Sequence, residues 1–477
     1  HTTSVKKELV RGNQSINWYP AHIKEGRFGE WLRNGVDWAI SRERYWGTPI
    51  PIWHCEKCDD YLCVGGLDEL KEHAIPNDDI DLDSLDLHRP YVDNVLLCCT
   101  KCNGEMRRIP EVMDAWFDSG AMPFAQWNIT SPSQLEDIRN DGRFPAEYIC
   151  EAVDQTRGWF YSLLATSTLV TGEPSYKNVI CLGLILDEKG RKMSKSLGNA
   201  INPWEILNAQ GADAIRWYLF TATQPGDSRR FSEKLVNEVV RRFMLTLWNV
   251  YSFFVTYAEI DGYDPSRTPD SQKDSTELDR WILSELNSLV GQVDESLESY
   301  DPTNGGRRIQ EFVDLLSNWY IRRSRRRFWR SGSDTDKLSG YHTLYKCLVT
   351  LSKLMAPYAP FLAEELYQNL VRSTDSTSPE SVHLSEFPTK DETLIDQPLM
   401  EATRLAMKIS SLGRDARSRA GKKVRVPLQT VVVRPQNKKE IPYFTNITSQ
   451  ILEELNVKQL TILKDDDPFY QKIIGEL

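Results

Sequence analysis

The sequence predicts a multidomain protein in which an α/β region is followed by an all-α helical bundle and a small α+β segment. Two changes of pattern carry this prediction. Strand-like apolar runs alternate with helical runs across residues 111–225, and from about residue 230 the apolar residues recur with a helical period. The chain has 477 residues, which corresponds to about three domains at roughly 150 residues each.

The α/β region is built around one apolar run, residues 178–186. This run is short and rich in β-branched residues, which indicates a buried strand. We expect a helix before it, over residues 156–170. A further helix should begin at Asn202 and Pro203, because Asn is a favoured N-cap and Pro a favoured first helical residue. Alternation of strands and helices predicts a parallel α/β unit.

The second half of the chain is predicted to be helical. One set of apolar residues shares a helical face over residues 235–254, and a second set does so over residues 278–297. Further helices are expected at residues 306–330, 340–356 and 360–372, which together predict a bundle of about 150 residues. Polar stretches at 373–379 and 388–398 then lead to an expected helix at 401–420 and a strand at 430–433.

Composition limits the classes of function. The formal net charge is -10, so a nucleic-acid partner would have to bind local basic patches. The longest apolar runs fall well short of the roughly 18 residues of a membrane helix. The first ten residues contain no apolar segment typical of a signal peptide, and they lack an initiator Met. We therefore expect a cytoplasmic protein and a chain that is one part of a longer one.

Four of the nine cysteines form two C-x-x-C pairs separated by 40 intervening residues. Thiolates at this spacing favour tetrahedral Zn²⁺, and without a neighbouring carboxylate base the site is expected to be structural. Four free thiols are the alternative reading. Cys98 competes with Cys99, and His54 and Cys63 are further possible ligands. The expected zinc ligands are Cys55, Cys58, Cys99 and Cys102.

A loop with two lysines follows the predicted strand. Lys192 and Lys195 flank a Met-Ser pair, and Gly190 and Gly198 bound the loop. An ammonium group is a compact charge on a flexible stem, which suits a phosphate that changes position during a reaction. A solvated basic turn is the alternative. The pentapeptide of residues 192–196 resembles the second signature of the class I aminoacyl-tRNA synthetases. The resemblance implies that ATP, with Mg²⁺, is a substrate, that Lys192 and Lys195 are catalytic, and that Ser194 and Ser196 bind ATP.

Three further segments resemble the isoleucyl-tRNA synthetases: residues 37–51, 114–120 and 151–160. Valyl enzymes usually have Ser where this chain has Asp118. The resemblance implies an aminoacyl-adenylate site lined by Glu151, Asp154, Gln155 and Gly183. It also implies an isoleucine pocket walled by Trp116 and Trp159, and aromatic walls suit a branched aliphatic side chain. Leu182 stands where this family often has His, which removes one polar contact to the nucleotide.

Each of these residues also has a structural reading. Trp116 and Trp159 could simply pack in a core, and Asp154 could form a surface ion pair with Arg157. The order of the motifs along the chain favours the functional reading.

Residues 317–330 combine six arginines with aromatic residues on one expected helix. Guanidinium groups pair with phosphates, and aromatic rings stack on unpaired bases. The alternative is a solvated or salt-bridged face. We expect tRNA to bind here through Trp319, Arg322, Arg323, Arg326 and Arg330. A second basic cluster follows, at Arg414, Arg417, Arg419, Lys422, Lys423 and Arg425.

The resemblance as a whole implies an isoleucine–tRNA ligase that acts on L-isoleucine, ATP and tRNA(Ile), as a monomer. The implied segments are a return into the catalytic domain (1–50), a zinc insertion (51–110), half of a Rossmann-like catalytic domain (111–228), a helical anticodon-binding domain (229–395) and a C-terminal junction (396–477). None of the seven histidines has the His-x-Gly-His spacing of the first class I signature, so we expect the chain to be inactive alone. The alternatives are a valyl-tRNA synthetase and a non-catalytic tRNA-binding protein built from synthetase parts.

Overall fold

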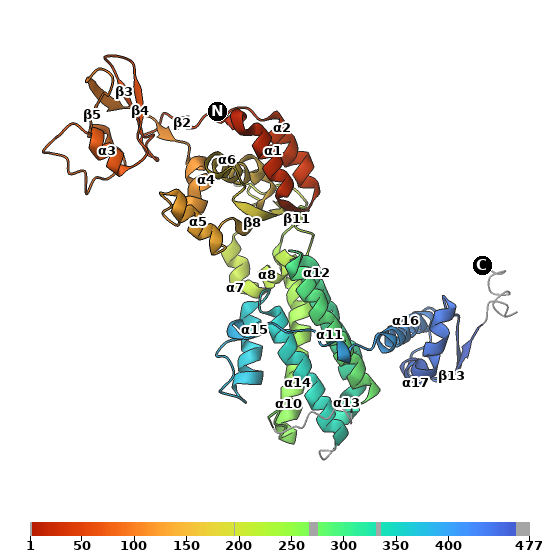
Figure 1. Cartoon of the computed structure of the whole chain (residues 1–477). Coiled ribbons are helices and arrows are strands. Elements are labelled where there is room, and N and C mark those ends of the chain that lie inside the picture. The colour runs from red at the N-terminus through yellow and green to blue at the C-terminus, as the bar shows by residue number, and fades with distance from the viewer. Residues whose placement is uncertain (1, 195, 267–274, 331–334, 464–477) are drawn as a thin grey trace. The chain divides into compact units, whose positions relative to one another are not determined.

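The computed structural model describes residues 2–194, 196–266, 275–330 and 335–463 (Figure 1). The chain divides into two compact units. The first comprises residues 1–193 with 224–230, and the second comprises residues 194–223 with 231–477. No helix among the described residues is long and apolar enough to cross a membrane. The finer domain boundaries expected from the sequence stay predictions.

The first unit is organised around a parallel sheet. Strands β1 (Asn17–Tyr19), β9 (Tyr176–Leu182) and β8 (Ala146–Ala152) lie in the order β1-β9-β8. Its core joins the sheet to helices α1 (Lys6–Ser15), α2 (Gly29–Asn34) and α6 (Trp159–Thr171), and Phe28, Phe160 and Leu164 are fully buried there. Helices α4 (Ala115–Ala125) and α5 (Pro132–Asn140) precede β8. The predicted parallel α/β unit and its helix before β9 are confirmed.

The predicted strand over residues 178–186 is interrupted. β9 ends at Leu182, and a separate strand β10 (Ile185–Leu186) pairs in parallel with β11 (Arg229–Arg230). The break falls at Gly183, where a Cβ atom would lie 2.2 Å from the backbone oxygen of Asp227. The close approach of a distant backbone segment therefore separates what the sequence shows as one apolar run.

The cysteine-bearing insertion has its own sheet and core. Strands β4 (Tyr61–Cys63), β3 (Ile52–Cys55), β6 (Glu105–Arg108) and β5 (Leu97–Cys98) form an antiparallel sheet in that order, accompanied by α3 (Leu67–His73). Trp53, Leu97 and Met106 are buried in it. The strands β2 (Ser41–Arg42) and β7 (Val112–Met113) pair with each other, so the chain enters and leaves the insertion at adjacent points.

The second unit contains the helical bundle. Its helices are α7 (Pro203–Gln210), α8 (Ala212–Thr221), α9 (Glu233–Val239), α10 (Leu245–Asp261), α11 (Glu277–Glu298), α12 (Pro302–Leu315), α13 (Arg322–Trp329), α14 (Thr335–Met355) and α15 (Pro360–Tyr367). A π-helical turn, Leu316–Ile321, joins α12 to α13. The predicted apolar faces are confirmed, since Phe243, Leu247, Ile282 and Leu286 are buried in one core. The Asn202 side chain caps α7 as predicted, by accepting from the Trp204 N–H at 3.1 Å.

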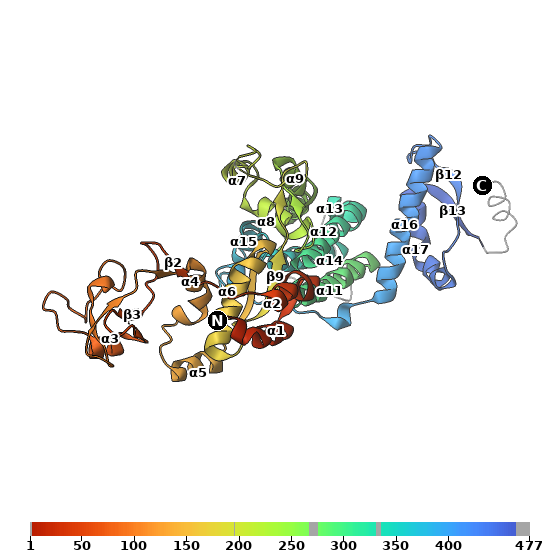
Figure 2. The ribbon, with the colours of Figure 1, turned by 90° about the horizontal axis from the view of Figure 1, so that it is seen from above.

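The chain then forms a small α+β segment. Helices α16 (Gln397–Arg419) and α17 (Phe444–Leu455) pack against each other beside the parallel strands β12 (Leu428–Val433) and β13 (Val457–Ile462) (Figure 2). Ile447 and Ile451 of α17 belong to the same buried cluster as the bundle core. The predicted helix and strand are confirmed, and they begin earlier than expected, at Gln397 and Leu428.

Candidate active site

Four of the expected substrate-binding residues lie at one edge of the parallel sheet. Glu151 lies near the carboxyl end of strand β8, where it pairs in register with Cys181 of β9, and Gly183 follows directly after β9. Asp154 and Gln155 lie in the 3₁₀ turn Val153–Arg157 that follows β8. The carboxyl ends of parallel strands are where open α/β sheets bind ligands. The structure therefore brings these residues to a chemically suitable edge.

The Gln155 side chain is held at both ends. Its Oε1 accepts from the Trp159 N–H at 3.0 Å, and its Nε2 donates to Asp154 Oδ2 at 3.1 Å. Gln155 thus caps the first turn of α6, a role that the N-cap Gly158 has no side chain to fill. Arg157, the expected ion-pair alternative for Asp154, donates to the Arg27 carbonyl at 2.9 Å. The amide orientation is therefore fixed before any ligand binds.

Trp116 and Trp159 lie in the first turns of α4 and α6, two helices that pack against each other. The Asp114 side chain caps α4 by accepting from the Trp116 N–H at 3.2 Å, and Trp159 Nε1 donates to the Ser119 carbonyl at 3.4 Å. Gly120 allows this approach, because a Cβ atom there would lie 2.7 Å from the Ser162 carbonyl oxygen of α6. The Trp116 residue is 42% exposed, so core packing alone does not account for it.

The lysine loop begins with an ordered turn. Leu186 and Lys192 form an isolated antiparallel bridge, and Asp187 accepts from both the backbone and the Nε of Arg191 at 2.8 Å. Gly190 at the turn has φ +80, a conformation that favours glycine. Lys195 lies outside the described residues.

The serines of the loop bond to each other and to a nearby asparagine. The Ser194 N–H donates to Asn199 Oδ1 at 2.9 Å, and the hydroxyls of Ser194 and Ser196 lie 3.1 Å apart. The Leu197 N–H donates to the Ser194 hydroxyl at 3.2 Å. Lys192 belongs to the first unit, whereas Ser194 and Ser196 belong to the second.

The four expected zinc ligands converge. The Sγ atoms of Cys55, Cys58, Cys99 and Cys102 all lie within 4.8 Å of one another. The Cys58–Cys99 and Cys55–Cys102 sulfur pairs are 3.5 and 3.6 Å apart. Tetrahedral Zn²⁺ with bonds near 2.3 Å requires sulfur separations of about 3.8 Å. A Cβ atom at Gly104 would lie 3.1 Å from Cys102 Sγ, so the small residue leaves room for the thiolates.

The structure distinguishes Cys99 from Cys98. Cys99 is buried within the cluster, whereas Cys98 is exposed on β5 and does not belong to it. Cys98 is the last residue of β5, whereas Cys99 begins the turn that follows, where its N–H donates to the Gly104 carbonyl at 2.8 Å. The cluster fits a metal such as zinc, and its donor atoms come from two similar turns in which Asp59 and Asn103 have positive φ.

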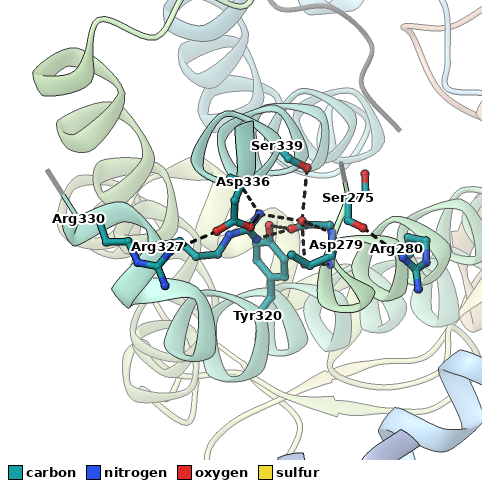
Figure 3. Close-up of polar contacts among 9 residues, drawn as sticks. Ser275, Asp279, Arg280, Tyr320, Arg327, Arg330, Asp336 and Ser339 are labelled. Atoms are coloured by element: carbon teal, nitrogen blue, oxygen red, sulfur yellow. Dashed lines mark hydrogen bonds and ion pairs between the residues drawn. The ribbon is translucent and has the colours of Figure 1, made fainter. Parts of the chain in front are cut away.

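The arginine-rich helix is largely engaged within the chain. Arg322 Nη2 donates to Glu454 Oε2 at 2.7 Å, and Arg323 Nη1 donates to Glu454 Oε1 at 2.8 Å. Arg327 is buried, and it binds both carboxylate oxygens of Asp279 at 2.8 and 2.9 Å (Figure 3). The salt-bridged reading therefore holds for these three arginines.

The expected role of Trp319 needs correction. Trp319 is only 6% exposed within the bundle core, so its ring presents no free face on which an RNA base could stack. The π-helical turn Leu316–Ile321 contains it, and such a turn shifts the face on which later residues lie. Arg326 and Arg330 remain exposed, although Arg330 lies 3.8 Å from Asp336.

Two sequence-family profiles match consecutive parts of the chain. Residues 1–232 match the family described as tRNA synthetases class I (I, L, M and V), and residues 279–432 match the anticodon-binding domain of tRNA ligase. The chain belongs to the class I aminoacyl-tRNA synthetases.

Curated relatives of this synthetase are isoleucine–tRNA ligases. One from Dehalococcoides mccartyi is 61% identical over 461 residues, which cover 97% of this chain and 45% of the relative. One from Thermus thermophilus is 48% identical over 466 residues, with 97% and 44% covered. The chain thus spans less than half the length of these relatives. The resemblance to the isoleucyl-tRNA synthetases is confirmed.

A solved structure agrees with the fold of the synthetase. The ternary LeuRS–tRNA–LeuAMS complex of Agrobacterium radiobacter K84 contains a chain that matches with a TM-score of 0.55 and 20% identity. The match covers 90% of this chain and 52% of that one. At this identity the match supports the predicted fold class, a synthetase catalytic region followed by a helical domain.

The sequence did not identify Asp114 as a residue that organises the candidate site. Asp114 is 7% exposed, and its Oδ2 accepts from Trp38 Nε1 at 3.0 Å and from Arg42. Asp118, which was noted only as a subfamily marker, accepts from the Thr48 hydroxyl at 2.7 Å. Both carboxylates therefore tie α4 to the segment of residues 37–51. Asp is a favoured N-cap residue, and this preference is the signal that could have identified Asp114 as a helix cap.

Proposed function

We propose that this chain is part of an isoleucine–tRNA ligase. One observation carries the proposal: the 3₁₀ turn with Asp154 and Gln155 lies against Trp116 and Trp159 at the carboxyl edge of the catalytic sheet. Carboxylate and amide oxygens can accept from an ammonium group and from ribose hydroxyls. Aromatic rings beside them can enclose a branched aliphatic side chain by apolar contact.

The reaction has two steps. The carboxylate of isoleucine attacks the α-phosphorus of ATP, pyrophosphate leaves, and isoleucyl-adenylate forms. A terminal ribose hydroxyl of tRNA(Ile) then attacks the carbonyl carbon, and AMP leaves. Glu151, Asp154 and Gln155 position the amino acid and the ribose, Trp116 and Trp159 select the side chain, and the backbone at Gly183 flanks adenine.

The lysine loop is proposed to stabilise the phosphates. The positive charges of Lys192 and Lys195 stabilise the negative charge that develops on the leaving pyrophosphate. Preorganised charges of this kind lower the free energy of the transition state. Ser194 and Ser196 are proposed to assist through their hydroxyl and backbone donors. Mg²⁺ accompanies ATP, and Zn²⁺ held by the four cysteines keeps the insertion folded.

We propose that tRNA binds along the second unit through the exposed Arg326 and Arg330. Phosphate contacts from exposed arginines supply sequence-independent affinity. Arg322 and Arg323 contribute only if RNA phosphates displace Glu454 from them. A monomer remains our proposal for the assembly.

Isoleucine-dependent ATP–pyrophosphate exchange by the full-length protein tests the proposal. We expect isoleucine to be the preferred amino acid and Lys195→Ala to lower kcat without preventing amino-acid binding. The 477-residue chain alone should show no exchange, because it contains no His-x-Gly-His. Preference for valine would favour the valyl alternative. Loss of all exchange in the wild-type protein would favour a non-catalytic tRNA-binding protein.

A further inference from the structure

Gly158 lies between the two groups that are proposed to enclose the substrate. A Cβ atom built on it would lie 2.7 Å from Gln155 Oε1 and 2.9 Å from Trp116 Cη2, with Trp116 Cζ2 at 3.2 Å. Contacts below about 3.0 Å are repulsive for carbon, whose favourable separation is about 3.5–4.0 Å. Only a residue without a side chain therefore fits between the Trp116 ring and the Gln155 amide.

Neither neighbour can move at no cost. The Gln155 amide is bonded at one end to the Trp159 N–H and at the other to Asp154. The backbone of Trp116 is held by the Asp114 cap, and Gly120 keeps α4 close to α6. A side chain at position 158 would therefore shift the half-exposed Trp116 ring, disturb the Gln155 cap, or do both.

We propose that Gly158 is a specificity-determining residue of the amino-acid site, because its missing side chain sets the positions of the Trp116 ring and the Gln155 amide. This inference rests on the proposed function, which assigns that ring and that amide to the isoleucine site. A methyl group at position 158, together with a displaced ring, takes up space comparable to one methylene group. Isoleucine and valine also differ by one methylene group. The loss of space should therefore lower kcat/KM more for isoleucine, the larger substrate, than for valine.

The test uses the full-length protein with Gly158→Ala. In amino-acid-dependent ATP–pyrophosphate exchange, kcat/KM for isoleucine should fall by about tenfold or more, the scale of one methylene group in a tight pocket. The fall for valine should be smaller, and KM for ATP should stay unchanged. Gly66→Ala is the matched control, because Gly66 has an extended backbone and nothing within 4 Å of its built Cβ. It should leave all three constants unchanged.

A double-mutant cycle with Trp116→Phe tests the stated contact. The smaller ring does not reach the positions of Cη2 and Cζ2, so Gly158→Ala should cost less in the Trp116→Phe background than in the wild type. If Gly158→Ala prevents folding, Trp116→Phe should restore the thermal unfolding midpoint of the double variant.

The outcomes separate this inference from the proposed function. A wild-type protein without isoleucine-dependent exchange would refute the proposed function. If the wild type is active and Gly158→Ala lowers kcat/KM by the same factor for isoleucine and for valine, the specificity role of Gly158 is overturned. Additive effects of Gly158→Ala and Trp116→Phe, on activity or on folding, would overturn it as well.

Discussion

Arg327 and Asp279 form a bidentate ion pair inside the helical bundle. The guanidinium of Arg327, in α13, donates to both carboxylate oxygens of Asp279, in α11, at 2.8 and 2.9 Å. Asp279 is fully buried, and it also accepts from the hydroxyls of Tyr320 and Ser339 (Figure 3). The two residues are 48 positions apart in the sequence. Their ion pair therefore fixes how α13 packs against α11.

Removal of this carboxylate should strongly destabilise the bundle. Asp279→Ala removes the fully buried carboxylate and leaves the partly exposed Asp336, 2.9 Å away, as the carboxylate partner of Arg327. Breaking a buried pair in this way costs about 3–5 kcal/mol of unfolding free energy. Urea unfolding followed by far-ultraviolet circular dichroism measures the change. Asp294→Ala, at an exposed position of the same helix, is the control and should stay within about 0.5 kcal/mol of the wild type. Equal effects of the two substitutions would contradict this role of the pair.

The same pair predicts a dependence on pH. Burial raises the pKa of Asp279, but its bonds to Arg327 outweigh burial and leave the pKa below the ordinary value of 3.8. A lowered pKa stabilises the folded state above the ordinary value, and this contribution is lost as the pH falls through the folded pKa. The difference in unfolding free energy between the wild type and Asp279→Asn should therefore be constant above about pH 5 and shrink below pH 3.8. A difference in unfolding free energy that stays constant down to about pH 2 would contradict the lowered pKa of Asp279.

Glu454 should fix the C-terminal segment to the bundle. Its side chain is 4% exposed and contacts Arg322, Arg323 and Arg414, so Glu454→Ala leaves three guanidinium groups without this partner. We expect a loss of about 3 kcal/mol, measured as faster hydrogen exchange in α17. Glu453→Ala is the neighbouring control: its side chain is 71% exposed, and exposed pairs contribute about 0–1 kcal/mol. Similar exchange rates in both variants would argue against a fixing role for Glu454.

The helices of this chain could be predicted because their signals are local. The Asn202–Pro203 start and the apolar faces around Phe243 and Ile282 depend on spacing within one segment. The break at Gly183 could not be predicted, because it depends on the backbone of Asp227 more than 40 residues away.

The same distinction applies to the sites. C-x-x-C spacing located the cysteine cluster, but only the folded structure separates Cys99, which is buried among the thiols, from Cys98, which is exposed on β5. Helical spacing placed Trp319 beside exposed arginines, whereas the π-helical turn and the bundle core bury it. The partners of Arg322 and Arg323 lie about 130 residues away, beyond any local pattern.

The cysteine cluster predicts about one equivalent of zinc per purified chain. Cys99→Ser should lose the metal, because three thiolates bind Zn²⁺ less tightly than four, and Cys98→Ser should retain it. Metal analysis by mass spectrometry gives both values. Removal of the metal by a chelator should unfold the insertion, since binding free energy at structural sites is folding free energy. Less than about half an equivalent in the wild type would argue against a zinc site.

The most direct test of the account is the formation of isoleucyl-tRNA by the full-length protein from isoleucine, ATP and tRNA(Ile). We expect charging of tRNA(Ile) with isoleucine by the wild type and no charging by the 477-residue chain alone. In Lys195→Ala the rate should fall by at least about a hundredfold, because a positive charge that stabilises the transition state is lost. Charging with valine in preference to isoleucine, or full activity in the Lys195→Ala variant, would contradict it.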